Sequence, residues 1–288
     1  MNELAPPIIA ALVISLMGGA LSVFVVLKRL AFIGQGISHA AFGGVGIALV
    51  LGVHGATAAG AIGQLGIVVV FSVLAALWIA ALTRTHQGRA DTAIGVVLSA
   101  SMALGFILFT IAESGHAHDQ AGAAEHQGGH HLIEEILFGN ILDTDWPKAT
   151  ITIATALGIV LLTWLMRRRL IFWVFDEPVV DAFGLNANRI TNAFMVILAI
   201  AIVMAMQIAG VVLAAAMLVL PGAGALNLST KLKPVFIYSI LIAVIGAALG
   251  MFVGFKADYP LGPSIVLTQS AIYLLTHITK AVSPRVRS

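Results

Sequence analysis

Five of the nine histidines in this 288-residue chain lie in one segment that is rich in glycine and alanine. Within residues 114–131, seven side chains could bind a divalent metal: His116, His118, His126, His130, His131, Asp119 and Glu125. Imidazole and carboxylate groups bind transition metals, and zinc best suits a site without redox chemistry. The segment predicts a loop that captures metal weakly and exchangeably, because its ligands are flexible. A polar connector that happens to contain many histidines is the alternative.

A further histidine, His39, lies near the start of an apolar stretch and follows Ser38 directly. An ionisable residue at membrane depth is costly and normally faces a cavity or a partner. His39 is therefore either a ligand on a transport path or a structural histidine bonded to a neighbouring carbonyl. Adjacent residues on a helix point about 100° apart, so Ser38 and His39 do not form a nucleophile and its base. This geometry argues against a serine hydrolase.

The elements that must position these residues are membrane helices. The chain is 60% hydrophobic and 10% charged, with a mean hydropathy of +1.04, whereas a soluble domain has about 25% charged residues. This composition predicts an all-α, polytopic bundle that forms a single transmembrane domain over residues 1–288. The sequence has no cysteine, which excludes disulfides and thiolate metal sites. It also contains no phosphate-binding G-x-x-x-x-G-K-[ST] motif, so any ATP is bound by another chain.

Nine apolar stretches have the length of a membrane span. They cover residues 5–27, 37–53, 57–82, 91–112, 147–166, 190–208, 210–227, 234–255 and 261–280. Only Gln207 and Gly210 interrupt the run between 193 and 226, so one long helix there would reduce the number to eight. We favour nine, with a tight hairpin or re-entrant element after Gln207, because only then do Lys231 and Lys233 share the side of most other bases.

Basic residues predict the orientation, because they accumulate on the cytoplasmic side of membrane proteins. Alternating spans place thirteen of the fifteen bases on one side: Lys28, Arg29, Arg84, Arg89, Arg167, Arg168, Arg169, Arg189, Lys231, Lys233, Lys280, Arg285 and Arg287. Only Lys148 and Lys256 fall on the other side. We therefore expect an N-terminus outside and a C-terminus inside, in a bacterial cytoplasmic membrane. Bases scattered in this way indicate topology and no nucleic-acid partner.

On the cytoplasmic side, residues 175–187 predict a short amphipathic helix. Asp176, Glu177 and a following proline form a helix start, and Gly184 with Asn186 forms an end. No lysine or arginine occurs between 170 and 188, so the polar face is acidic and poorly suited to an anionic bilayer surface. We expect this helix to dock into a cytoplasmic partner, and a helix lying on lipid is the alternative. The candidate contact residues are Asp176, Glu177, Asp181, Phe183 and Gly184.

Small residues recur every four positions in three spans and predict close helix packing, since lipid supplies no hydrophobic drive for helix association. The three sets are Gly36, Ala40 and Gly44; Gly95, Ser99 and Ala103; and Gly246, Gly250 and Gly254.

Several motifs, taken together and in order, resemble the permease subunits of zinc and manganese ABC importers. They are R-L-A-F-I-G-Q-G-I-S-H-A-A-F-G-G-V-G-I-A-L (29–49), A-D-T-A-I-G (90–95), L-F-G-N-I-L (137–142), D-E-P-V-V-D-A-F-G-L (176–185), V-L-P-G-A-G-A-L (219–226) and P-L-G-P-S-I-V-L (260–267). The resemblance covers nearly the whole chain.

The resemblance implies a homodimeric permease that works with two cytoplasmic ATPase subunits and an extracytoplasmic metal-binding protein. It implies no permanently bound cofactor, only a transported divalent metal. The family's coupling helix corresponds to Asp176–Leu185, and its S-H-A motif corresponds to Ser38, His39 and Ala40. It therefore favours His39 as a ligand on the metal path, with Ser38 and Gln35 as further candidates.

Two departures from the family bear on the ion. Gln35 replaces a common aspartate, and Phe42–Gly44 replaces a common Leu-Pro-Gly. Loss of a carboxylate disfavours manganese, and the histidine-rich segment favours zinc, so we expect an ATP-driven zinc importer. Manganese or iron import by the same fold is the first alternative. A proton-coupled secondary carrier is the second, but the spans contain no acidic residue away from their ends.

Overall fold

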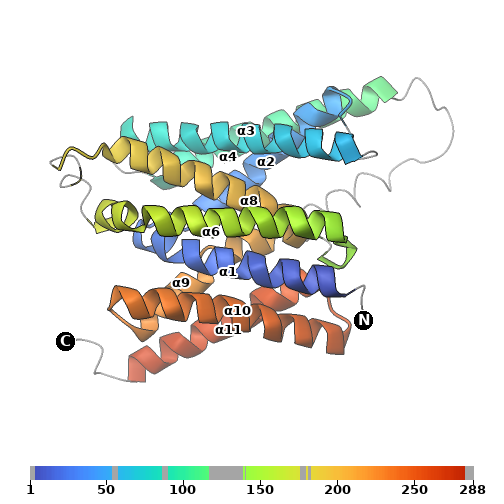
Figure 1. Cartoon of the computed structure of the whole chain (residues 1–288). Coiled ribbons are helices and arrows are strands. Elements are labelled where there is room, and N and C mark those ends of the chain that lie inside the picture. Colours follow the sequence, from blue (N-terminus) through green and yellow to red (C-terminus); the bar gives the residue numbers. More distant parts are fainter. Residues whose placement is uncertain are drawn as a thin grey trace. The chain divides into compact units, whose positions relative to one another are not determined.

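The computed structural model describes residues 4–53, 58–85, 90–116, 139, 141–175, 180 and 183–282. All regular structure in these residues is helical, which confirms the predicted all-α bundle (Figure 1). The helices pack into two compact units. Unit 1 comprises Met1–Ala31, Glu135–Ile190 and Met204–Ser288, and unit 2 comprises Phe32–Glu134 and Thr191–Val203.

Unit 1 is built around the N-terminal helix α1 (Ala5–Leu27), which packs against α6 (Trp146–Phe175), α9 (Leu220–Leu228) and α10 (Leu232–Ala257). A short 3-10 turn, η1 (Ile141–Asp143), leads into α6 and also contacts α1. The last helix, α11 (Leu261–Val282), packs against α9 and α10. Most of α1 is buried, so it forms the core of this unit.

The long helix α8 (Ala187–Met217) contains a break at Gly210, where φ is +75° and ψ is +167°. Backbone of this kind is accessible only to glycine. After the break, the chain runs alongside α1 and parallel to it. Met217 contacts Ser15 near the middle of α1, and Gly222 donates its amide hydrogen to Ser22 one to two turns further on. Residues 211–228 are therefore a separate limb that ends with α9.

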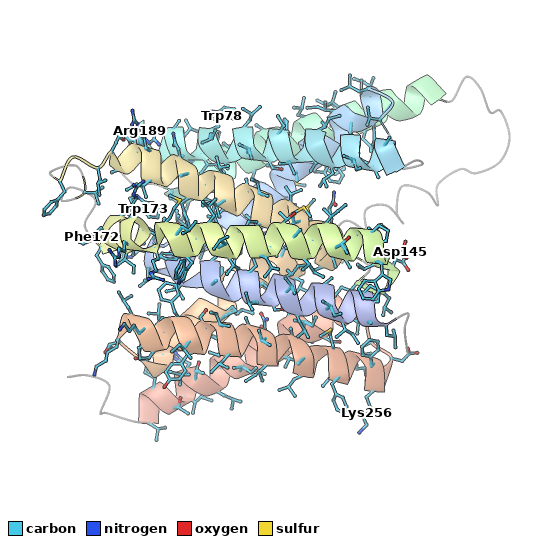
Figure 2. All side chains as sticks on the ribbon, viewed as in Figure 1. Trp78, Asp145, Phe172, Trp173, Arg189 and Lys256 are labelled. Atoms are coloured by element: carbon cyan, nitrogen blue, oxygen red, sulfur yellow. The ribbon has the colours of Figure 1, made fainter. Side chains whose placement is uncertain are left out.

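The first limb of α8 begins at the end of unit 1 where Arg189 and Trp173 lie (Figure 2). Gly210 packs on Gly139, which precedes η1 and the start of α6 at the other end. Within unit 1, residues 187–190 therefore lie at one end and Gly210 at the other, and residues 211–228 return toward the first end. By length and composition, eight described helical segments could span a membrane, with 187–228 counted once. This count equals the alternative of eight spans, and nine spans stay a prediction.

The ends of unit 1 differ in charge. The side chain of Lys28 lies 4.3 Å from the Trp173 ring, which joins the ends of α1 and α6. Val23, Ala225 and Val235 share one apolar cluster, which brings α9 and the start of α10 to the same end. We call this the basic end; it carries Lys28, Arg29, Arg167, Arg168, Arg169, Lys231, Lys233 and Lys280. Asp145 and Lys256 lie at the opposite end (Figure 2).

Unit 2 is a group of three helices: α2 (Ile33–Val50), α3 (Ala58–Thr85) and α4 (Ala90–His116), with residues 191–203 of α8. Contacts of α2 glycines show that α4 runs parallel to α2 and α3 runs antiparallel. Gly36 lies against Ile94 and Gly46 against Gly105, whereas Gly44 lies against Val68. An arginine at the end of α3 joins α8 to this unit, because Arg84 donates a hydrogen bond to the Asn192 side chain.

Candidate functional site

The predicted metal-path residues Gln35 and His39 lie in the first two turns of α2, four positions apart. Residues at this spacing share one face of a helix. Gln35 is exposed and His39 is partly buried, so their face is not sealed by the rest of the chain. An amide oxygen and an imidazole nitrogen on one accessible face are two neutral donors for a divalent metal. Such a pair leaves most coordination positions to water or another chain, which suits an ion in transit.

Ser38 lies on a different, buried face of α2. Its side chain is 1% exposed, and its hydroxyl donates a 2.7 Å hydrogen bond to the carbonyl oxygen of Gly34 in the same helix. This local bond satisfies the hydroxyl at the position where it is buried. The structure therefore groups His39 with Gln35 and separates it from Ser38.

Glycines hold α2 close to its neighbours and so determine where His39 lies. A Cβ at Gly36 would lie 2.5 Å from the Cγ2 of Ile94, and one at Gly44 would lie 2.9 Å from the Cα of Val68. Ala40, the residue between them in the predicted ridge, is fully buried. Because a larger residue at these positions would force α2 away from α3 and α4, the ridge positions the site.

An aromatic pair lies beside this site. The ring centroids of Phe42 and Phe106 are 5.3 Å apart, so α2 and α4 are bridged about one turn beyond His39. Gly105 lies under the same phenylalanine, because a Cβ there would meet the Phe42 ring at 2.9 Å. Phe42 is one of the positions where the family commonly has a Leu-Pro-Gly sequence. In this chain a packed aromatic contact occupies that place.

The histidine-rich segment begins at the end of α4. His116 is the last residue of α4, and His118, Asp119, Glu125, His126, His130 and His131 lie outside the described residues. Within the part of the chain that the structure describes, no three His, Cys, Asp or Glu side chains are grouped to hold a metal. The metal-capture role of the segment stays a prediction.

The predicted cytoplasmic helix is described only in part: Asp176, Glu177 and Asp181 lie outside the described residues. Its predicted end is well defined. Gly184 has φ of +73°, and the Leu185 amide donates a 3.1 Å hydrogen bond to the Val180 carbonyl oxygen. A left-handed glycine followed by such a bond is the usual C-terminus of a helix. Phe183, just before the glycine, is 77% exposed and is available to a partner.

The role of Asn186 differs from the prediction. Its side-chain oxygen accepts a hydrogen bond from the Arg189 amide at 3.1 Å, so it caps the start of α8. Gly184 alone therefore ends the preceding turn, and Asn186 begins the next helix. Gly184 and Asn186 are only two positions apart, which explains why the sequence pattern assigned both of them to one helix end.

The other two predicted glycine ridges differ from each other. Gly246, Gly250 and Gly254 on α10 all contact α11 closely: Cβ atoms there would lie 2.7 Å from Gln269, 2.9 Å from the Ile265 amide nitrogen and 2.8 Å from Leu261. Gly95, in contrast, has nothing within 4 Å of a Cβ, and Ser99 and Ala103 on the same face are also exposed. Packing of this α4 face within the chain was a wrong prediction.

Two packing glycines were missed. A Cβ at Gly139 would overlap the Gly210 backbone, and one at Gly222 would lie 2.6 Å from the Ser22 hydroxyl oxygen. Both glycines belong to motifs that carry the family resemblance, 137–142 and 219–226. Their spacing shows no periodicity, so only the motifs themselves could have indicated them. They mark where distant segments of unit 1 meet, at the reversal of α8 and at the start of α9.

Comparison with known proteins agrees with this architecture. The model of a family described as the ABC 3 transport family matches residues 1–280. The manganese import system permease protein ScaB of Streptococcus gordonii is 30% identical over 269 residues, covering 93% of this chain and 88% of ScaB. The manganese transport system membrane protein MntC of Halalkalibacterium halodurans is 31% identical, covering 92% of this chain and 83% of MntC.

A solved structure of PsaBC from Streptococcus pneumoniae, in complex with Fab, contains a chain of the same fold. That chain is 30% identical, with a TM-score of 0.79, and the match covers 100% of this chain and 94% of the other.

Proposed function

The chain belongs to the ABC 3 transport family, and from that membership we propose that it is the membrane permease of an ATP-driven importer of a divalent transition metal ion. The observation that carries the proposal is the match of the family model to residues 1–280. The accessible Gln35–His39 face on α2 adds a place where a metal ion would be held in passage. The chain itself is a transport component and hydrolyses no ATP, because it has no phosphate-binding motif.

The partners follow from the same proposal. Two copies of the chain would form the path, with ATPase subunits on the cytoplasmic side and a metal-binding protein on the outside. The charge difference between the ends of unit 1 supports an orientation with the basic end inside. This orientation places the N-terminus outside and the C-terminus inside a bacterial cytoplasmic membrane.

Coupling to the ATPase would pass through the helix that Gly184 ends. Nucleotide-driven closure of the ATPase subunits would move this helix, and the helices joined to it would open the path to one side at a time. Exposed Phe183 provides an apolar contact for the ATPase, and α8, capped by Asn186, begins three residues after Gly184. Movement of this helix therefore has a short connection to the membrane-spanning part.

Manganese is the ion that we propose first. The relatives ScaB and MntC are named for manganese import, which replaces the expectation of zinc. Zinc remains the second candidate on one specific observation, the five histidines of residues 114–131.

A pull-down tests the proposal. The tagged chain is purified in mild detergent from its native membrane as wild type, Gly184→Arg and the control Gly184→Asn. Asparagine tolerates a left-handed backbone, whereas arginine adds strain and bulk at an exposed position. We expect an ATPase subunit to co-purify with wild type and Gly184→Asn and to be lost from Gly184→Arg. Purification of the wild-type chain alone, at good yield, would instead favour the proton-coupled carrier.

A further inference from the structure

Helix α6 is longer than a membrane span requires. Its 30 residues extend about 45 Å, against a hydrocarbon core of about 30 Å. Trp146 begins the helix and Trp164 lies 18 residues later, about 27 Å along the axis. Both tryptophans are more than half exposed, as expected for residues at the two membrane interfaces. The residues after Trp164 therefore lie at the level of the lipid headgroups and beyond.

Three consecutive arginines occupy this level. Arg167, Arg168 and Arg169 are all exposed, and the guanidinium of Arg167 lies 4.2 Å from the centre of the Trp164 ring. Consecutive helical positions point about 100° apart, so the three side chains surround the outward half of α6. The inward half is occupied by buried Leu170 and Trp173.

The positive charge extends to α1. Lys28 lies over the Trp173 ring at 4.3 Å, and Arg29 follows it in a left-handed conformation at the end of α1. Among the described residues of unit 1, every carboxylate lies at the opposite end, on Asp143, Asp145 and Asp258. The cations at the ends of α1 and α6 thus lie together as a patch at the basic end of this unit, and its described acids lie at the other end.

An apolar stripe leads to the patch along the outward face of α6. Leu157, Leu161, Leu165 and Phe172 lie between 53% and 64% exposed, and Arg168 occupies the same face between the last two. The spacing of four, four, three and four residues keeps these side chains in one line. A phospholipid has this combination of parts, since its acyl chains would lie on the leucines and its phosphate would meet the arginines.

We propose that the cytoplasmic end of α6 binds an anionic phospholipid of the inner leaflet. Arg167, Arg168 and Arg169 would hold the headgroup phosphate through charge-assisted hydrogen bonds, for which the planar guanidinium is well suited. Leu157, Leu161 and Leu165 would contact an acyl chain. The inference rests on the membrane orientation proposed above, with the basic end inside, and is independent of which ion is transported.

The test measures lipid binding to the full chain in detergent by native mass spectrometry. The probes are phosphatidylglycerol and phosphatidylcholine with identical acyl chains. The test variant is Arg167→Gln/Arg168→Gln/Arg169→Gln, and the matched control is Lys231→Gln/Lys233→Gln/Lys280→Gln, which removes equal charge at the same end from other helices. Monodispersity on size-exclusion chromatography checks that each variant is folded, and Arg168→Gln alone replaces the triple variant if that one aggregates.

We expect wild type to prefer phosphatidylglycerol. Each arginine removed is expected to cost roughly fivefold in affinity, or about 100-fold for all three, whereas the lysine variant keeps most of the preference. Soluble glycerol phosphate, which lacks acyl chains, is expected not to compete. Equal losses in both triple variants, equal binding of the two lipids to wild type, or competition by glycerol phosphate would each overturn the proposal.

A second copy of the chain or the ATPase could cover the same surface. If the arginine variant keeps its lipid preference and instead loses the dimer or the co-purifying ATPase, the patch is a protein interface and the lipid proposal is wrong. Because binding is measured in detergent without nucleotide or metal, a failure here leaves the transport proposal standing. A failure of metal uptake, in turn, leaves the lipid result unaffected.

Discussion

At the scale of residues, the central feature is the pair on the outer face of α2. His39 and Gln35 are one turn apart and accessible, whereas Ser38 is buried and bonded to Gly34 within its own helix. Sequence alone could place His39 and Gln35 on one face, because that follows from the helical repeat. It could not show that Ser38 faces inward, because the residues that bury it come from other parts of the chain.

Replacing His39 with alanine is expected to reduce metal uptake at least tenfold, because the change removes the only nitrogen ligand of the pair. Ser38→Ala is the matched control, and we expect it to change uptake by less than twofold, since its hydroxyl bonds only within its helix. Uptake is measured in cells at equal membrane abundance of each variant. Equal uptake by His39→Ala and Ser38→Ala would remove His39 from the path.

Gln35→Asp is expected to shift ion preference toward manganese. The change adds a charged, hard oxygen one turn from His39, and manganese favours carboxylate ligands more than zinc does. Competition of unlabelled zinc against radioactive manganese uptake measures the shift, and Gln35→Glu tests whether the charge or its exact position matters. A preference that is unchanged in both variants would show that Gln35 does not contact the ion.

At the scale of elements, glycines determine how closely the helices approach. Lipid surrounds these helices, so close van der Waals contact does much of the work of holding them together. Gly250 is the tightest example on α10, because a Cβ there would overlap the Cα of Ile265 and lie 2.9 Å from its amide nitrogen. Gly158 on α6 has nothing within 4 Å and provides a comparison.

Gly250→Ala is expected to destabilise the protein by about 2 kcal/mol, since the new methyl group meets backbone that cannot rotate away. Gly158→Ala is expected to be neutral or slightly stabilising, because alanine has the higher helix propensity and space is available. Thermal unfolding in detergent compares both variants with wild type. Similar melting temperatures for the two variants would mean that α10 and α11 are less closely packed than described.

The sequence was informative about elements and less so about their contacts. Apolar length located the helices, and the positions of Lys231 and Lys233 indicated the reversal that the structure places at Gly210. The ridge on α10 and the ridge at Gly95 have the same pattern, yet only the first is packed. Their difference depends on which helix lies opposite, and that information comes from residues far away in the chain.

At the scale of the whole molecule, the proposed importer needs an energy source besides the path and the coupling segment that we propose for this chain. Its family and the absence of a phosphate-binding motif from the sequence are the grounds on which we propose a partner that hydrolyses ATP. A gradient-driven carrier would instead need intramembrane groups that bind and release protons. Among the described spans, His39 is the candidate ligand, and no carboxylate accompanies it on α2.

Metal uptake into vesicles tests the central claim most directly. The chain is reconstituted into vesicles with its co-purifying ATPase subunit. ATP is supplied on the side of the membrane where the basic end lies, and radioactive manganese with its binding protein is supplied on the other side. We predict uptake that requires ATP, exceeds that of zinc and is abolished by His39→Ala. Uptake that proceeds without ATP under a proton gradient, or ATP hydrolysis that moves no metal, would contradict the account.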